Sequence, residues 1–130
     1  MLVVDANVAL GASSEPRGFE RFSGETLVAP PLMWAEARSG LHEALWRHEI
    51  GAEQAAAAFD ALHAAAIEAR DHHDLPREAW RVADELGWAK TYDAEYVALA
   101  RLLGCRLVTL DGRLRRGAAR LGIVSLPSEL

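Results

Sequence analysis

The chain has 130 residues, 51% of them hydrophobic, which fits one folded domain spanning residues 1–130 with a substantial core. Its net charge of −5 argues against a protein that coats nucleic acid through overall positive charge, and its single cysteine excludes a disulfide framework. No apolar run approaches the roughly 18–20 residues of a membrane helix. The first ten residues carry no basic side chain, so we expect a cytoplasmic protein without a membrane segment.

The first quarter of the chain predicts two strands separated by a helix and a loop. Residues 2–4 are apolar and partly β-branched, which is typical of a strand covered on both faces in a parallel sheet. A helix is expected over residues 5–10. Residues 13–25 are polar and contain proline and glycine, so they predict a loop with one helical turn. Residues 26–29 predict a second strand, which Pro30 ends.

The middle of the chain predicts a pair of helices. Apolar side chains recur at helical spacing in residues 32–49, and Gly51 interrupts the pattern. Residues 52–70 are rich in alanine and predict a second helix, antiparallel to the first. Residues 70–75 include two adjacent histidines and are the candidate for a short edge strand.

The last third alternates helices with strands. The expected helices are 76–86, 92–103 and 112–121, and the expected strands are 106–110 and 123–126. Strands that alternate with helices predict a parallel sheet with helices on both faces. We therefore expect the α/β class, as a three-layer α/β/α sandwich around a central parallel sheet of four to five strands.

Four acidic residues stand at the joints between these elements. Asp5 and Asp111 each end a strand-like run, Glu36 lies early in the helix after the second strand, and Asp93 begins a helix. The carboxyl ends of parallel strands meet at one edge of a sheet, which is where open α/β sheets bind ligands. Taken singly, each acid has a plain alternative as a helix cap, a first-turn acid or a surface residue. Their shared position at the joints favours a common site.

Carboxylates that converge in this way repel one another. At an effective dielectric constant of about 20, each close pair costs roughly 3–4 kcal/mol, and a divalent cation removes that cost. Oxygen ligands without a cluster of Cys or His favour Mg²⁺ or Mn²⁺ over zinc. Such an ion can activate water for attack on phosphorus, so the pattern predicts phosphodiester hydrolysis.

Positive charge gathers close to the last of these acids. Residues 101–120 hold six arginines and one acid, a local charge of +5, which leaves −10 for the rest of the chain. Arg113, Arg115 and Arg116 lie within five residues of Asp111 and are candidate RNA phosphate contacts. The alternative is a solvated helix face.

The four acids lie in motifs that resemble those of a known family. Asp5-Ala6-Asn7, after the opening strand, resembles the first motif of PIN-domain ribonucleases, and residues 31–38 resemble the second, with its helical glutamate. Residues 92–100 and 107–111 are similar to the third and fourth motifs and are the most specific stretch. The size and spacing resemble the VapC-type toxins of bacterial toxin–antitoxin pairs.

The resemblance implies catalytic and metal-binding roles for the quartet Asp5, Glu36, Asp93 and Asp111. Asp5 and Asp93 would bind Mg²⁺, or Mn²⁺ as a substitute. Glu36 and Asp111 would bind it directly, through water, or through a second ion. Asn7 and Thr109 match polar positions beside the acids and are interpreted as hydrogen-bonding partners of the ligands, with simple capping roles as the alternative.

The resemblance also implies partners. VapC-type toxins act on RNA, bind a cognate VapB-like antitoxin whose C-terminal segment lies across the helical pair, and commonly form homodimers. The leading hypothesis is thus a Mg²⁺-dependent endoribonuclease acting as such a toxin. The alternatives are a catalytically inert or signalling α/β domain with an acidic metal-binding pocket, and a phosphohydrolase with an aspartyl nucleophile. Asn7 stands where that phosphohydrolase requires a second aspartate. A signalling domain would require a lysine after a late strand, whereas the only lysine, Lys90, precedes a helix.

Overall fold

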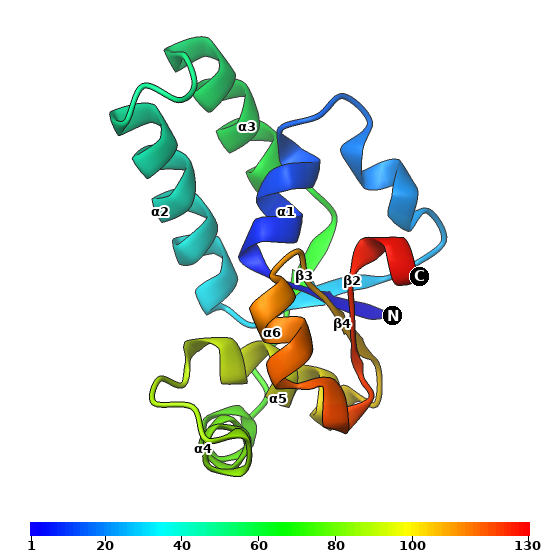
Figure 1. Ribbon diagram of the computed structural model, residues 1–130. Coiled ribbons are helices and arrows are strands. Elements are labelled where there is room, and N and C mark those ends of the chain that lie inside the picture. Colours follow the sequence, from blue (N-terminus) through cyan, green and yellow to red (C-terminus); the bar gives the residue numbers. More distant parts are fainter.

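A five-stranded parallel sheet forms the centre of the protein in the computed structural model, which describes all residues 1–130 (Figure 1). The spatial order of the strands is β3-β2-β1-β4-β5. Their bounds are β1 (Leu2–Val4), β2 (Leu27–Ala29), β3 (Ile67–Ala69), β4 (Arg106–Val108) and β5 (Val124–Ser125). Every neighbouring pair is parallel, so the carboxyl ends of all five strands lie at one edge of the sheet.

The central strands are short, apolar and buried on both faces. In β1, Val3 pairs with Val28 on one side and with Leu107 on the other, and all three side chains are fully buried. A strand that is covered on both faces needs a continuous apolar sequence, which residues 2–4 supply. The buried residues of the central strands therefore belong to the main hydrophobic core, which holds the strands in place.

Helices cover both faces, which confirms the predicted α/β sandwich (Figure 1). The helices α1 (Ala6–Ser13), α2 (Leu32–Trp46) and α3 (Ala52–Ala64) pack against one another on one side. On the other side lie α4 (Leu75–Leu86) and α5 (Tyr92–Leu103), and α5 packs directly on β1 and β4. No helix combines the length and the apolar composition needed to cross a membrane.

The edge strand lies earlier in the chain than the sequence predicts. Residues 70–75 are not a strand; β3 is Ile67–Ala69, and α3 ends at Ala64 rather than at residue 70. Ile67 is buried and pairs with Leu27, so sheet pairing overrides the helical propensity of the alanine-rich run. The rest of β3 is exposed, as is typical of an edge strand.

The remaining segments are short helices and turns. A 3-10 helix, Gly18–Phe22, provides the single helical turn expected in the loop 13–25. The predicted helix 112–121 is divided into α6 (Gly112–Gly117) and a 3-10 helix, Ala119–Leu121. The C-terminal residues Pro127–Glu129 form a further 3-10 helix.

Candidate active site

The four acids of the quartet line one cavity at the carboxyl edge of the sheet. Asp5 directly follows β1 and Asp111 follows the neighbouring β4, while Glu36 comes from α2 and Asp93 from the first turn of α5. The cavity has a volume of about 130 Å³. Its lining is completed by Ala6, Asn7, Tyr96 and Leu114. Side chains separated by up to 106 positions in sequence, from Asp5 to Asp111, are thus brought together.

Asp5 is held by hydrogen bonds to both of its carboxylate oxygens. It is 6% exposed and caps α1, because Oδ1 accepts a hydrogen bond of 2.9 Å from the Val8 amide. Oδ2 accepts a hydrogen bond from the Thr109 hydroxyl. Burial raises the pKa of Asp5 to about 6; the two hydrogen bonds oppose this rise, and the charges of Asp93 and Asp111 add to it.

Thr109 connects two acids of the quartet. Its side chain is completely buried, donates to Asp5 and accepts a 3.0 Å hydrogen bond from the backbone amide of Asp111. Asp111 in turn caps α6, since its Oδ1 accepts from the amides of Arg113 at 2.8 Å and Leu114 at 3.3 Å. One hydroxyl therefore fixes the ends of both β1 and β4 relative to each other.

Asp93 has no hydrogen-bond partner for its carboxylate. Partial desolvation raises its pKa, the charge of Asp111 raises it further, and Arg113 opposes the rise. Asn7 also lines the cavity, but its side chain is exposed and makes no hydrogen bond within the protein. The site thus contains side chains whose polar atoms remain free for a ligand.

Tyr96 is a site residue that was not predicted from the sequence. It is 2% exposed, lines the cavity, and donates a hydrogen bond of 2.5 Å to Oε1 of Glu36. Burial and this hydrogen bond raise the pKa of the Tyr96 hydroxyl, so it stays protonated and remains a donor. Tyr96 lies three residues after Asp93 on the same face of α5. That spacing, with the need of a buried tyrosine for a hydrogen-bond partner, was the available signal.

The three candidate phosphate-binding arginines lie in different surroundings. Arg113 borders the quartet in an adjoining hollow. Arg115 forms an ion pair of 3.0 Å with Glu129 at the C-terminus. Arg116 lines neither hollow and makes no side-chain ion pair. Their distance from Asp111 in the sequence predicted that all three would lie near the site. In the structure only Arg113 lines the adjoining hollow, because the three side chains leave α6 in different directions.

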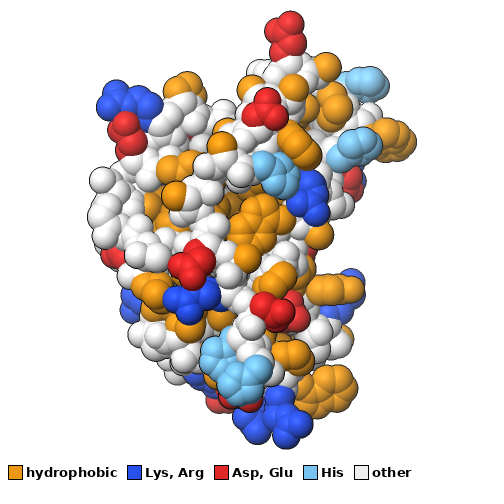
Figure 2. Space-filling model, turned by 180° about the vertical axis from the view of Figure 1, so that it is seen from behind, with side chains coloured by type: hydrophobic (Ala, Val, Ile, Leu, Met, Phe, Trp, Pro, Cys, Tyr) orange, Lys and Arg blue, Asp and Glu red, His pale blue; other side chains and the backbone are white.

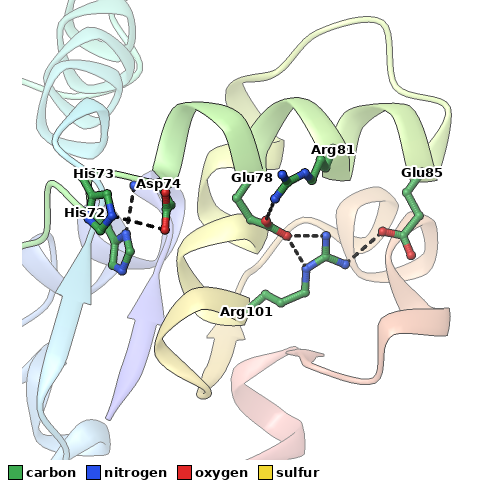
Figure 3. Close-up of polar contacts among 7 residues, drawn as sticks. All are labelled: His72, His73, Asp74, Glu78, Arg81, Glu85 and Arg101. Atoms are coloured by element: carbon green, nitrogen blue, oxygen red, sulfur yellow. Dashed lines mark hydrogen bonds and ion pairs between the residues drawn. The ribbon is translucent and has the colours of Figure 1, made fainter.

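Only one group of three His, Cys, Asp or Glu side chains brings its ligand atoms within 4.8 Å of one another, and it lies outside the quartet. It consists of His72, His73 and Asp74, between β3 and α4 (Figure 3). His72 Nδ1 already accepts a 3.1 Å hydrogen bond from the Asp74 amide, and His73 is exposed. The carboxylates of the quartet are more widely spaced.

Comparison with known proteins identifies the family. Residues 2–120 match the PIN domain. The chain belongs to the PIN-domain family. It is 34% identical over 129 residues to a VapC ribonuclease of Mycobacterium bovis, an alignment that covers 98% of this chain and 99% of the relative. The same values hold for ribonuclease VapC9 of Mycobacterium tuberculosis. Ribonuclease VapC1 of M. tuberculosis is 40% identical over 115 residues, which cover 86% of this chain and 82% of VapC1.

Two solved structures share the PIN-like fold. The crystal structure of PAE2754 from Pyrobaculum aerophilum superposes with a TM-score of 0.73 at 22% identity, covering 98% of this chain and 85% of that one. A chain of a toxin–antitoxin complex from Klebsiella pneumoniae gives a TM-score of 0.65 at 18% identity, covering 98% of both chains. The arrangement of strands and helices is thus shared well beyond recognisable sequence similarity.

Proposed function

We propose that this PIN-domain protein is a metal-dependent endoribonuclease, using Mg²⁺ or Mn²⁺, and that it is the toxin of a toxin–antitoxin pair. The observation that carries the proposal is the cavity that collects Asp5, Glu36, Asp93 and Asp111 without an ion pair to any of them. Its support is the similarity along nearly the whole chain to proteins named VapC ribonucleases. Hydrolysis of a phosphodiester needs an activated water, and the four carboxylates that line the cavity could hold a divalent cation to supply it.

The four acids have two kinds of role in this proposal. Asp5 and Asp93 would be the direct ligands, since both line the cavity without an ion pair and burial raises the pKa of each carboxyl, so that a bound cation would stabilise the charged form. A bound Mg²⁺ supplies a water of lowered pKa and offsets negative charge on the phosphate. Glu36, held by Tyr96, and Asp111, held at the N-terminus of α6, orient water at the scissile phosphate.

The surroundings of the quartet place no ion-pair partner on any of its four carboxylates. Thr109 keeps Asp5 in a fixed rotamer, and the buried hydroxyl has no charge of its own. Arg113 borders the acids without forming an ion pair with any of them. The cavity therefore retains a net negative charge for a cation, while a cationic side chain stands beside it for the phosphate that arrives with the RNA.

The helical pair offers a surface for the antitoxin. A hollow of about 730 Å³ between α2 and α3 is lined mainly by apolar side chains, among them Trp46 and Phe59, which are 73% and 45% exposed. Hydrophobic and histidine side chains lie together over this pair (Figure 2, upper right). An exposed apolar patch of this kind is typical of a protein interface, and we propose that a VapB-like antitoxin occupies it. A homodimer is also part of the proposal.

The test is cleavage of RNA by the purified protein with Mg²⁺, with Mn²⁺ and with EDTA. We expect cleavage with either metal and none with EDTA, and recovery when excess Mg²⁺ is restored. Equal cleavage in EDTA would exclude a metal mechanism, and no cleavage of transfer, ribosomal or messenger RNA under any of these conditions would exclude a ribonuclease. Co-expression with the product of the neighbouring gene tests the antitoxin: a cognate antitoxin should co-purify and suppress the cleavage.

A further inference from the structure

A second hollow, of about 550 Å³, lies directly beside the acidic cavity. We call it the side groove. The two hollows share four residues: Glu36, Asp93, Asp111 and Leu114. The rest of the side groove is lined by residues 87–90, Tyr92 and Arg113. A volume of this size is typical of sites for small organic groups, so the groove has room for a nucleotide beside the proposed reaction centre.

Charge is distributed unevenly along the side groove. Its acids all belong to the wall that it shares with the quartet, whereas Lys90 and Arg113 belong to the side groove alone. Neither cation forms a salt bridge with any carboxylate of the protein. In contrast, Arg101 and Arg115 are both engaged with glutamates. The groove thus offers two uncommitted cations next to a site that we expect to bind a phosphodiester.

Tyr92 adds an exposed aromatic ring to the same groove. It is 61% exposed and its hydroxyl makes no hydrogen bond within the protein. It is the first residue of α5 and directly precedes Asp93, so the helix fixes its position relative to the quartet. An exposed aromatic side chain beside free cations is the combination with which proteins bind single-stranded nucleic acid, the rings stacking on bases and the cations contacting phosphates.

Packing holds the loop that carries Lys90 in place. The loop leaves α4 at Gly87, whose backbone is left-handed at φ 71°. Trp88, partly buried, lies against Gly117 at the end of α6, where an added Cβ would stand 3.4 Å from the indole ring. The loop therefore rests closely on α6, and the wall of the groove is formed before any ligand arrives.

We propose that the side groove binds the nucleotide next to the scissile phosphate of a single-stranded RNA, with its base stacked on Tyr92 and its phosphate contacted by Lys90 and Arg113. This inference rests on the proposed ribonuclease function, and it adds the residues that hold the nucleotide beside the scissile phosphate. A base in a duplex is stacked between its neighbours, so its face is not available to Tyr92. Unpaired loops and ends of RNA offer both an accessible base face for Tyr92 and a phosphate for Lys90 and Arg113.

The test measures binding, so that it is independent of cleavage. All variants are made in the Asp5→Asn background, since Asp5 does not line the side groove and its loss prevents turnover. Fluorescence anisotropy compares a short labelled single-stranded RNA of mixed sequence with the same sequence in a duplex. We expect Tyr92→Ala to weaken single-strand binding by about tenfold and Tyr92→Phe to preserve it. Lys90→Gln should reduce the slope of log affinity against log salt by about 0.7.

Two matched controls lie on α4, away from the groove. Trp80→Ala removes an aromatic ring that is 67% exposed, and Arg77→Gln removes a cation without a salt bridge. Both should leave RNA affinity unchanged. The inference is overturned if Tyr92→Ala binds like its parent, if the duplex binds as well as the single strand, or if the parent binds no RNA. Metal-independent cleavage by the wild-type protein would instead overturn the proposed mechanism and leave the binding result standing.

Discussion

Two clusters of acidic side chains in this protein have opposite electrostatic surroundings. On α4, Glu78 and Glu85 flank Arg101 of α5, with contacts of 2.6 Å and 2.9 Å, and Arg81 adds a further contact to Glu78 (Figure 3). These contacts lower the pKa of Glu78, foremost through the hydrogen bond from Arg101. At the carboxyl edge of the sheet, Asp5 and Asp93 have no cationic partner in contact, and their pKa values are raised.

The difference separates a structural use of carboxylates from a functional one. The cluster on α4 joins two helices, and each of its acids finds its counter-charge within the chain. The quartet accumulates negative charge without an ion pair, and burial raises the pKa of Asp5 and Asp93, which is a destabilising arrangement unless something binds there. Uncompensated acids at the ends of parallel strands thus carry more information about function than the number of acids on the surface.

The largest effect on RNA cleavage should come from neutralising an acid of the quartet, and the matched substitution in the cluster on α4 should have none. Asp93→Asn removes a proposed metal ligand, so we expect RNA cleavage to fall by about a hundredfold or more. Glu78→Gln likewise replaces a carboxylate with an amide, but in the cluster on α4, and it should leave the cleavage rate at 25 °C unchanged. The measurement is the initial rate of cleavage at saturating Mg²⁺. Similar losses in both variants would mean that the two clusters do not differ in function.

The second prediction concerns stability without metal. Burial raises the pKa of Asp5 from 3.8 to about 6, so the folded protein holds this proton more tightly than the unfolded chain. The contribution of Asp5 to stability is therefore greatest below pH 4 and is lost as the pH rises through 6, a cost on the order of 3 kcal/mol at neutral pH. Asparagine carries no charge and can still cap α1.

Asp5→Asn should therefore raise the free energy of unfolding in EDTA at pH 7.5 by about 1–3 kcal/mol, and the gain should shrink below pH 6. Urea unfolding at both pH values measures this difference. Mg²⁺ should stabilise the wild type, by about 1.4 kcal/mol at ten times its dissociation constant, and should not stabilise the variant. A variant less stable than the wild type at both pH values in EDTA would contradict the assignment of uncompensated charge to Asp5.

The smallest effect should come from the residue that positions Glu36. Tyr96→Phe removes only the hydroxyl that donates to Glu36 Oε1, and we expect cleavage to fall by about tenfold, as for other residues that orient ligands. Because Tyr96 acts through Glu36, the loss should not add to that of Glu36→Gln in the double variant. Additive losses would show that Tyr96 contributes independently of Glu36.

Local patterns in the sequence predicted the parts of the site that depend on strand ends. Asp5 and Asp111 follow apolar runs that predict strands, and β1 and β4, which precede them, are neighbouring parallel strands that bring the two acids together. The family match agrees with the predicted resemblance. The roles of the individual acids stay predictions.

Features of the structure that depend on contacts between distant parts of the chain were not predicted from the sequence. Tyr96 meets Glu36 across 60 positions, and Arg115 is engaged by Glu129 in the final turn. Strand β3 was misplaced because the alanine-rich run before it has strong helical propensity, and only pairing with β2 shows where the helix must end. The side groove was not predicted either, because it is formed where the loop after α4 packs against α6.

The two hydrogen bonds to Asp5 have a consequence for the choice of ion in the proposed metal site. Each carboxylate oxygen has two lone pairs, and in Asp5 one lone pair on each oxygen is already occupied by Val8 or Thr109. The directions left for coordination are set when the chain folds, so the side chain cannot swing to suit ions of different radius. Among divalent cations, this rigidity favours the small ions with strict octahedral geometry over Ca²⁺, which tolerates irregular shells.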